Sequence, residues 1–74
     1  MNNLHYEIVR LLTQKETSYA WPMNSCEIGE ALQVTPSYIR SQLSRLVKEG
    51  RIGVRRGNGG GYYLIKEGTQ LYGD

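Results

Sequence analysis

The sequence predicts an α+β fold in which three short helices are followed by a β-hairpin. Three observations predict this fold. Apolar stripes have helical spacing, a helix-capping pattern lies between them, and residues alternate in character on both sides of a glycine run. The chain has 74 residues, which is enough for one domain near the lower size limit for a core-stabilised fold. Apolar residues make up 39% of it, too many for a disordered tail.

The first helix is predicted over residues 3–14. Its apolar stripe, with the spacing i, i+4, i+7 and i+8, consists of Leu4, Ile8, Leu11 and Leu12. Asn2 or Asn3 can cap it. A loop over residues 17–22 follows, because Pro22 moves the residue before it out of the helical region. We expect that residue, Trp21, to cover an edge of the core.

The second helix begins with a capping box. The Asn24 side chain can accept from an amide in the first turn, while the carboxylate of Glu27 reaches back. The residues expected to point inward are Ile28, Ala31 and Leu32. Gly29 costs the helix about 1 kcal/mol relative to alanine. Close approach of another helix is the simplest reason for a glycine there.

The third helix begins at Thr35 and Pro36, since threonine is a good N-cap and proline at the first position loses no hydrogen bond. Its apolar stripe consists of Ile39, Leu43, Leu46 and Val47. Gly50 ends it. The short turn at Gln33 and Val34 joins the second and third helices, and this layout is that of a helix-turn-helix.

The hairpin is predicted from residues 51–56 and 62–65. In the first segment Ile52 and Val54 point inward and alternate with Arg51, Gly53 and Arg55, while the second segment is rich in aromatic and β-branched residues. The glycine-rich residues 57–61 form the turn between them. Three helices and a hairpin give a winged helix-turn-helix domain over residues 1–65, followed by a short polar tail over residues 66–74.

Composition excludes several classes of function. A single cysteine excludes an internal disulfide and a four-cysteine metal site, and no apolar run is long enough to span a membrane. The G-x-G-x-G run joins strand to strand, so it is not a dinucleotide-binding or P-loop motif. We therefore expect a small, soluble, cytoplasmic domain that is not an enzyme and holds no cofactor or metal.

The single histidine and the single cysteine each have a structural and a functional interpretation. Neither has a histidine or cysteine partner near it in the sequence, which argues against nucleophilic catalysis. We expect His5 on the surface of the first helix. We expect Cys26 to be half-buried and structural, with redox sensing as the alternative.

Positive charge is concentrated in one segment. Residues 40–56 contain six basic residues and one acidic residue, whereas the rest of the chain contains three basic and six acidic residues. This distribution indicates an anionic partner on one face, although a solvated charged surface is the common alternative.

The outer face of the third helix carries hydroxyl groups and cations without an acid. Small polar side chains let a helix enter a major groove, and arginine can read guanine or hold phosphate. We assign base or sugar contacts to Ser37, Tyr38, Ser41 and Arg45. We assign phosphate contacts to Arg40, Lys48 and Thr35. In the wing, the predicted DNA contacts are Arg55, Arg56, Asn58 and Tyr62.

Three segments carry a resemblance to a known family. Residues 34–39, 46–50 and 54–64 resemble the DNA-binding domain of IscR-type bacterial winged-helix regulators, whose wing has a similar arginine, glycine and tyrosine pattern. The resemblance implies recognition by Tyr38, Arg40 and Ser41 and wing contacts by Arg55 and Arg56. In those regulators a long dimerisation helix and, in some, a three-cysteine cluster site follow, and these 74 residues end before either.

Two further observations qualify the resemblance. Gln33 stands where helix-turn-helix sequences usually have glycine, which predicts a strained or different turn. In size, the chain looks like the small PapI/FaeA-type regulators, which consist of one winged-helix domain.

The sequence therefore predicts a transcriptional regulator that binds specific sequences of double-stranded DNA. A homodimer or a larger regulatory protein as partner is expected to supply specificity, because one small domain buries little surface on DNA. The alternative is a winged-helix module for protein interaction, or a co-regulator that acts through a larger DNA-binding protein. Such a module would expose an apolar patch in place of the basic face.

Overall fold

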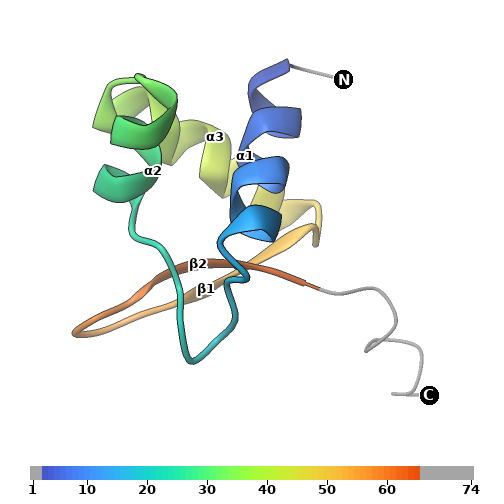
Figure 1. Cartoon of the computed structure of the whole chain (residues 1–74), viewed down its shortest axis with the longest axis vertical. Helices are drawn as coiled ribbons and strands as arrows, with labels where there is room; N and C mark the ends of the chain where they lie inside the picture. Colours follow the sequence, from blue (N-terminus) through green and yellow to red (C-terminus); the bar gives the residue numbers. More distant parts are fainter. Residues whose placement is uncertain (1–2, 66–74) are drawn as a thin grey trace.

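The computed structural model describes residues 3–65, which form the helices and the hairpin in the predicted order (Figure 1). The elements in chain order are α1 (Asn3–Gln14), α2 (Ser25–Leu32), α3 (Pro36–Lys48), β1 (Ile52–Arg55) and β2 (Gly61–Leu64). The two strands pair antiparallel, with Ile52 opposite Leu64 and Arg55 opposite Gly61. The predicted winged-helix fold is confirmed. The N-terminal cap of α1 and the tail lie outside the described residues.

The hydrophobic core lies where the three helices meet the base of the hairpin. Its fully buried side chains are Ile8, Leu12, Ile28, Ile39, Leu43, Leu46 and Ile52. These residues follow the stripes predicted for α1 and α3, in which Leu4, Leu11 and Val47 are half-buried. None of the helices within residues 3–65 is long and apolar enough to cross a membrane.

Only the prediction for Ala31 fails in the α2 stripe, because this side chain is exposed. The buried residues of α2 are Ile28 and Gly29, and Leu32 is half-buried between them on the helix surface. At about 100° per residue, Ala31 lies about 60° beyond Ile28 on the far side from Gly29. Its exposure therefore follows from the narrow buried face of this short helix.

The turn between α2 and α3 explains why residue 29 is glycine. A Cβ at Gly29 would lie 2.7 Å from the carbonyl oxygen of Val34 and 3.6 Å from Cγ2 of Ile39. The close neighbour is thus the backbone of the turn, with the α3 side chain only in ordinary contact, which corrects the expectation of a helix–helix approach. The predicted strain is present at Gln33, whose φ of 60° is left-handed.

The ends of the helices follow the capping signals in part. The capping box is confirmed: the Glu27 amide donates to Oδ1 of Asn24 at 2.8 Å, and the Asn24 amide donates to Oε1 of Glu27 at 3.1 Å. Thr35 is the N-cap of α3 and Pro36 follows it, but the threonine side chain makes no capping hydrogen bond. Gly50 lies just after α3 with a φ of 78° and ends the helix as predicted.

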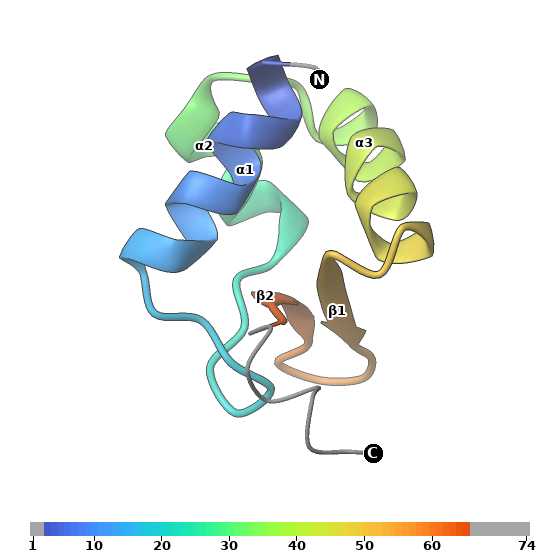
Figure 2. The ribbon, with the colours of Figure 1, turned by 90° about the vertical axis from the view of Figure 1, so that its right-hand side faces the viewer.

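The loop between α1 and α2 runs beside the hairpin (Figures 1 and 2). Met23 forms an antiparallel bridge with Tyr62, through hydrogen bonds of 2.9 and 2.7 Å between their backbones. The Thr17 hydroxyl donates to the Leu12 carbonyl at 3.0 Å and accepts from the Leu64 amide at 3.1 Å. The loop therefore ties the end of α1 to β2.

Trp21 does not cover the core, contrary to the expectation. It is 76% exposed, because it closes a tight turn in which its amide donates to the Ser18 carbonyl at 3.0 Å. In this turn the indole is left largely in contact with solvent. The half-buried Met23, two residues later, packs against the core in its place.

Candidate nucleic-acid interface

The surface of α3 that faces away from the core is polar and cationic. Its exposed residues include Ser37, Tyr38, Arg40, Ser41, Ser44, Arg45 and Lys48. The three buried apolar residues of this helix fix this orientation. The Ser41 hydroxyl donates to the Tyr38 carbonyl at 2.8 Å, which leaves its oxygen lone pairs as acceptors.

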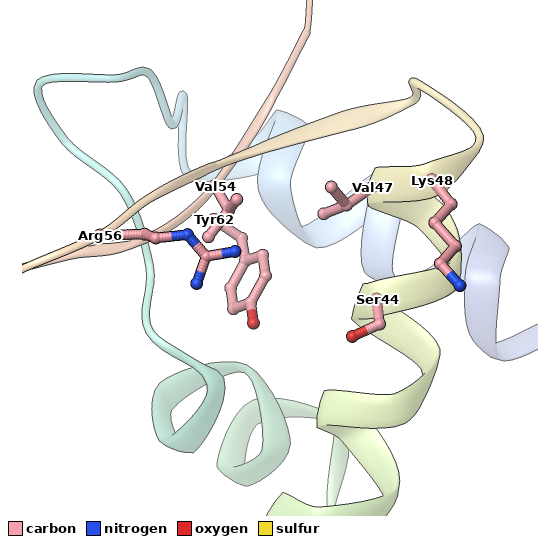
Figure 3. Close-up of a pocket in the computed structure, with 6 residues that line it drawn as sticks. All are labelled: Ser44, Val47, Lys48, Val54, Arg56 and Tyr62. Carbon is pink, nitrogen blue, oxygen red and sulfur yellow. The ribbon is translucent and has the colours of Figure 1, made fainter.

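A cleft separates the C-terminal half of α3 from the wing, meaning β1, β2 and the turn between them. It has a volume of about 310 Å³ and is lined by Ser44, Val47, Lys48, Val54, Arg56 and Tyr62. Figure 3 shows Arg56 and Tyr62 reaching in from the hairpin and Ser44 facing them from α3, while Lys48, also in the lining, extends along the outer side of the same helix. A cationic group therefore stands on each side of the cleft.

These cations have no acidic partners among the described residues. Within residues 3–65, no ion pair or hydrogen bond involves the side chain of Arg40, Arg45, Lys48 or Arg56. Their charges are consequently available to an anionic ligand. This arrangement fits the negative backbone of a nucleic acid.

The structure separates two arginines that the sequence placed in one role. Arg56 lines the cleft, but Arg55 is half-buried on the opposite side of the wing, where its Nη1 donates to the Tyr19 carbonyl at 2.8 Å. Arg55 is the last residue of β1 and Arg56 is the first residue after it, and the contacts of the two side chains lie on opposite sides of the wing. Arg55 is therefore not brought together with the other predicted contacts.

The remaining predicted contacts lie at different places. Tyr62 is half-buried and lines the cleft. Asn58 is exposed in the wing turn, between Gly57 and Gly59, which both have positive φ. Thr35 is exposed at the start of α3 and borders a separate, shallow groove beside the α2–α3 turn.

Sequence reasoning did not select Ser44, Val47 and Val54 as site residues, although all three line the cleft. Val47 and Val54 were expected in the core, and both are only half-buried. The two-residue spacing of Val54 and Arg56 could have indicated that both side chains lie on the same side of the wing, where both line the cleft. Ser44 shares the outer face of α3 with Ser41 and Arg45.

The family of the chain follows from comparison with known proteins. The model of the family Rrf2, described as an iron-dependent transcriptional regulator, matches residues 2–71. The chain belongs to the Rrf2 family. This match confirms the predicted resemblance to IscR-type regulators. The predicted class of function, transcriptional regulation, is also the function by which the Rrf2 family is described.

Curated relatives agree with the Rrf2 assignment. The chain is similar to the HTH-type transcriptional regulator IscR of three Escherichia coli strains: O1:K1 / APEC, O139:H28 (strain E24377A / ETEC) and K12 / DH10B. In each case it is 33% identical over 66 residues, which cover 89% of this chain. The match spans 41% of the length of these relatives.

The iron named in the description of the Rrf2 family has no fitting site in the described residues. Within residues 3–65, no group of three or more histidine, cysteine or acidic side chains is placed to hold a metal ion. Cys26 is exposed, which corrects the expectation of a half-buried thiol. His5 is 7% exposed and its Nε2 is paired with Gln42, so the expectation of a surface histidine is wrong as well.

Proposed function

We propose that this chain binds specific sequences of double-stranded DNA through α3 and the wing. The observation that carries the proposal is the cleft with cations on both walls, Lys48 from α3 and Arg56 from the wing. A convex helix beside a projecting hairpin can contact a groove and the adjacent backbone at the same time. Membership of a family of transcriptional regulators supports this use of the surface.

In this proposal α3 enters the major groove with its N-terminal half. Ser37, Tyr38 and Ser41 are exposed in this half and are short or planar enough to approach base edges and sugars. Arg45 lies one turn after Ser41 and can donate to a guanine with two parallel hydrogen bonds. Arg40, Lys48 and Thr35 contact phosphates on the flanks.

The wing contacts the neighbouring backbone or the minor groove. Arg56 and Tyr62 line the cleft beside α3, and Asn58 is exposed in the turn. A narrow minor groove attracts arginine because its negative potential is enhanced. Arg55 makes no DNA contact in this proposal, since its guanidinium is bound to the loop.

The alternative of a protein-interaction module predicts an apolar patch on the same face. Of the large exposed aromatic residues, Tyr38 lies on α3, whereas Tyr19 and Trp21 lie in the α1–α2 loop and Tyr6 lies on α1. On the face formed by α3 and the wing, Lys48 and Arg56 line the cleft and Tyr38 is the large exposed aromatic residue of α3, which favours DNA contact over an apolar docking patch. For high specificity we propose a second copy of the chain or a larger regulatory protein, because one domain buries little DNA surface.

Selection of duplexes from a random pool tests the proposal, with the mass of each selected complex measured alongside. Enrichment of two spaced half-sites in a complex with two protein chains supports a dimeric DNA-binding regulator. One half-site bound by one chain supports a monomer that depends on a different partner. No enrichment, together with binding that ignores sequence, contradicts specific recognition.

A further inference from the structure

The side of the wing that faces away from α3 carries a second set of contacts. Arg55 donates from Nη1 to the carbonyl oxygens of Tyr19 at 2.8 Å and Ala20 at 3.4 Å. Its guanidinium carbon lies 5.4 Å from the centroid of the Tyr19 ring, within the range of a cation–π contact. One side chain of β1 is thus held by both the backbone and the ring of the α1–α2 loop.

The contacts continue along the hairpin. The rings of Tyr19 and Tyr63 meet edge to face, with centroids 5.8 Å apart and planes at 81°. Tyr63 pairs with Gly53 across the strands, and its ring occupies the space that a Cβ on Gly53 would need. We call Arg55, Tyr19 and Tyr63 the loop–wing clasp.

The loop side of the clasp is itself well ordered by hydrogen bonds. Tyr19 and Ala20 are the central residues of a turn that Ser18 and Trp21 close, and the Trp21 amide also donates to the Ser18 hydroxyl at 3.2 Å. The loop is further joined to β2 through Met23. Arg55 is therefore bound to a supported segment.

The clasp bears on the direction of Arg56, the next residue. Arg56 directly follows the last residue of β1 and lines the cleft on the other side of the wing, so holding Arg55 against the loop restricts the rotation of the wing that would move Arg56 out of the cleft. A hairpin of two strands is marginally stable alone and twists readily. Contacts from outside the hairpin are thus needed to fix the orientation of the wing beside α3.

We propose that Arg55 is a positioning residue for DNA binding: it does not contact DNA but fixes the wing so that Arg56 does. This inference rests on the proposed function. If Arg55 only positions Arg56, replacing Arg55 lowers the affinity for a duplex when Arg56 is present and has little effect when Arg56 is already replaced. A phosphate contact by Arg55 itself would instead act independently of Arg56.

The first measurement examines the clasp without DNA. Backbone ¹⁵N order parameters of Val54 and Arg56 in the wing are compared in the wild-type chain, in Arg55→Met and in the matched control Arg10→Met. Arg10 is an exposed residue of α1, so its replacement removes the same charge away from the wing. We expect values of about 0.85 in the wild type and the control, and a fall toward about 0.6 in Arg55→Met.

The second measurement is a double-mutant cycle on affinity for a selected duplex. Arg55→Met is expected to weaken binding about threefold or more in the wild-type background, after correction by Arg10→Met, but less than about twofold in Arg56→Met. Arg55→Lys keeps the charge and loses the planar fork, so it should behave like Arg55→Met. Circular dichroism of each variant checks that it is folded.

Different results overturn different parts of the account. If Arg55→Met lowered duplex affinity by the same factor in the wild type and in Arg56→Met, Arg55 would have its own DNA contact, and the positioning role would be wrong. Unchanged order parameters at Val54 and Arg56 would show that the clasp does not fix the wing. A wild-type chain that binds no duplex overturns the proposed function, and with it the part of Arg55 in DNA binding.

Discussion

His5 of α1 and Gln42 of α3 are joined by a buried hydrogen bond, with 2.7 Å between Nε2 and Oε1. Because an amide oxygen only accepts, Nε2 of His5 is the donor. Both side chains are largely removed from solvent, at 7% and 8% exposure. The pair thus links the first helix to the helix proposed to enter the DNA groove.

Replacing one member of this pair is expected to destabilise the fold. Gln42→Leu leaves a buried ring nitrogen without its partner, so the free energy of unfolding should fall by about 1–3 kcal/mol in urea titrations. Replacing both, as His5→Phe with Gln42→Leu, removes both polar groups and should recover part of the loss. A double variant that loses the sum of the single effects would show that the two side chains do not act as a pair.

The Thr17 hydroxyl should contribute to stability more than other threonines of the chain. Thr17→Val keeps the shape but removes the bonds to the Leu12 carbonyl and the Leu64 amide. We expect thermal or urea unfolding to show a loss of about 1–3 kcal/mol. Thr13→Val is the matched control, because this exposed hydroxyl only bonds the Val9 carbonyl within α1. Equal losses in the two variants would contradict the bridging role.

Salt dependence distinguishes the cations of the cleft from other surface cations. Arg56→Met and Lys48→Met should each reduce the slope of log affinity against log salt by about 1, since each removes one phosphate contact. Fluorescence anisotropy of a labelled duplex over a range of salt concentrations measures the slope. Arg10→Met should leave it unchanged. If all three variants lowered the slope by the same amount, the change would come from the lower net charge of the chain and not from phosphate contacts of Arg56 and Lys48.

Sequence preference is expected to depend on the middle of α3. Ser41→Ala and Arg45→Met should change which duplexes are preferred, with discrimination at the affected base pair reduced by about 1–3 kcal/mol. Arg40→Met, on the flank of the same helix, should weaken all duplexes alike. Competition binding with a set of single-base variants measures both. A uniform loss in the first two variants would make Ser41 and Arg45 backbone contacts.

The elements of the fold could be predicted because their signals are local. The stripes of α1 and α3 repeat with helical period, the Asn24 capping box marks the start of α2, and the glycine turn separates two strand-like segments. Each signal lies within about one or two helical turns of chain. Local sequence therefore determined the order of the elements, and it gave each strand end to within one residue.

The environments of single side chains could not be predicted in the same way. His5 is buried because Gln42, 37 residues later, supplies its partner, and Arg55 lies apart from the cleft because the Tyr19 carbonyl, 36 residues earlier, binds it. Trp21 is exposed in the tight turn that it closes. These outcomes depend on contacts between residues far apart in the sequence, and neither periodicity nor charge counts can predict such contacts.

We propose that α3 and the wing contact a duplex together. Backbone amide shifts of the ¹⁵N-labelled chain, followed while a selected duplex is added, test it most directly. We expect the largest shifts on residues 37–48, on Arg56 and on the wing turn, with small shifts at Tyr19 and Trp21. Shifts concentrated on the α1–α2 loop, with α3 unaffected, would contradict it.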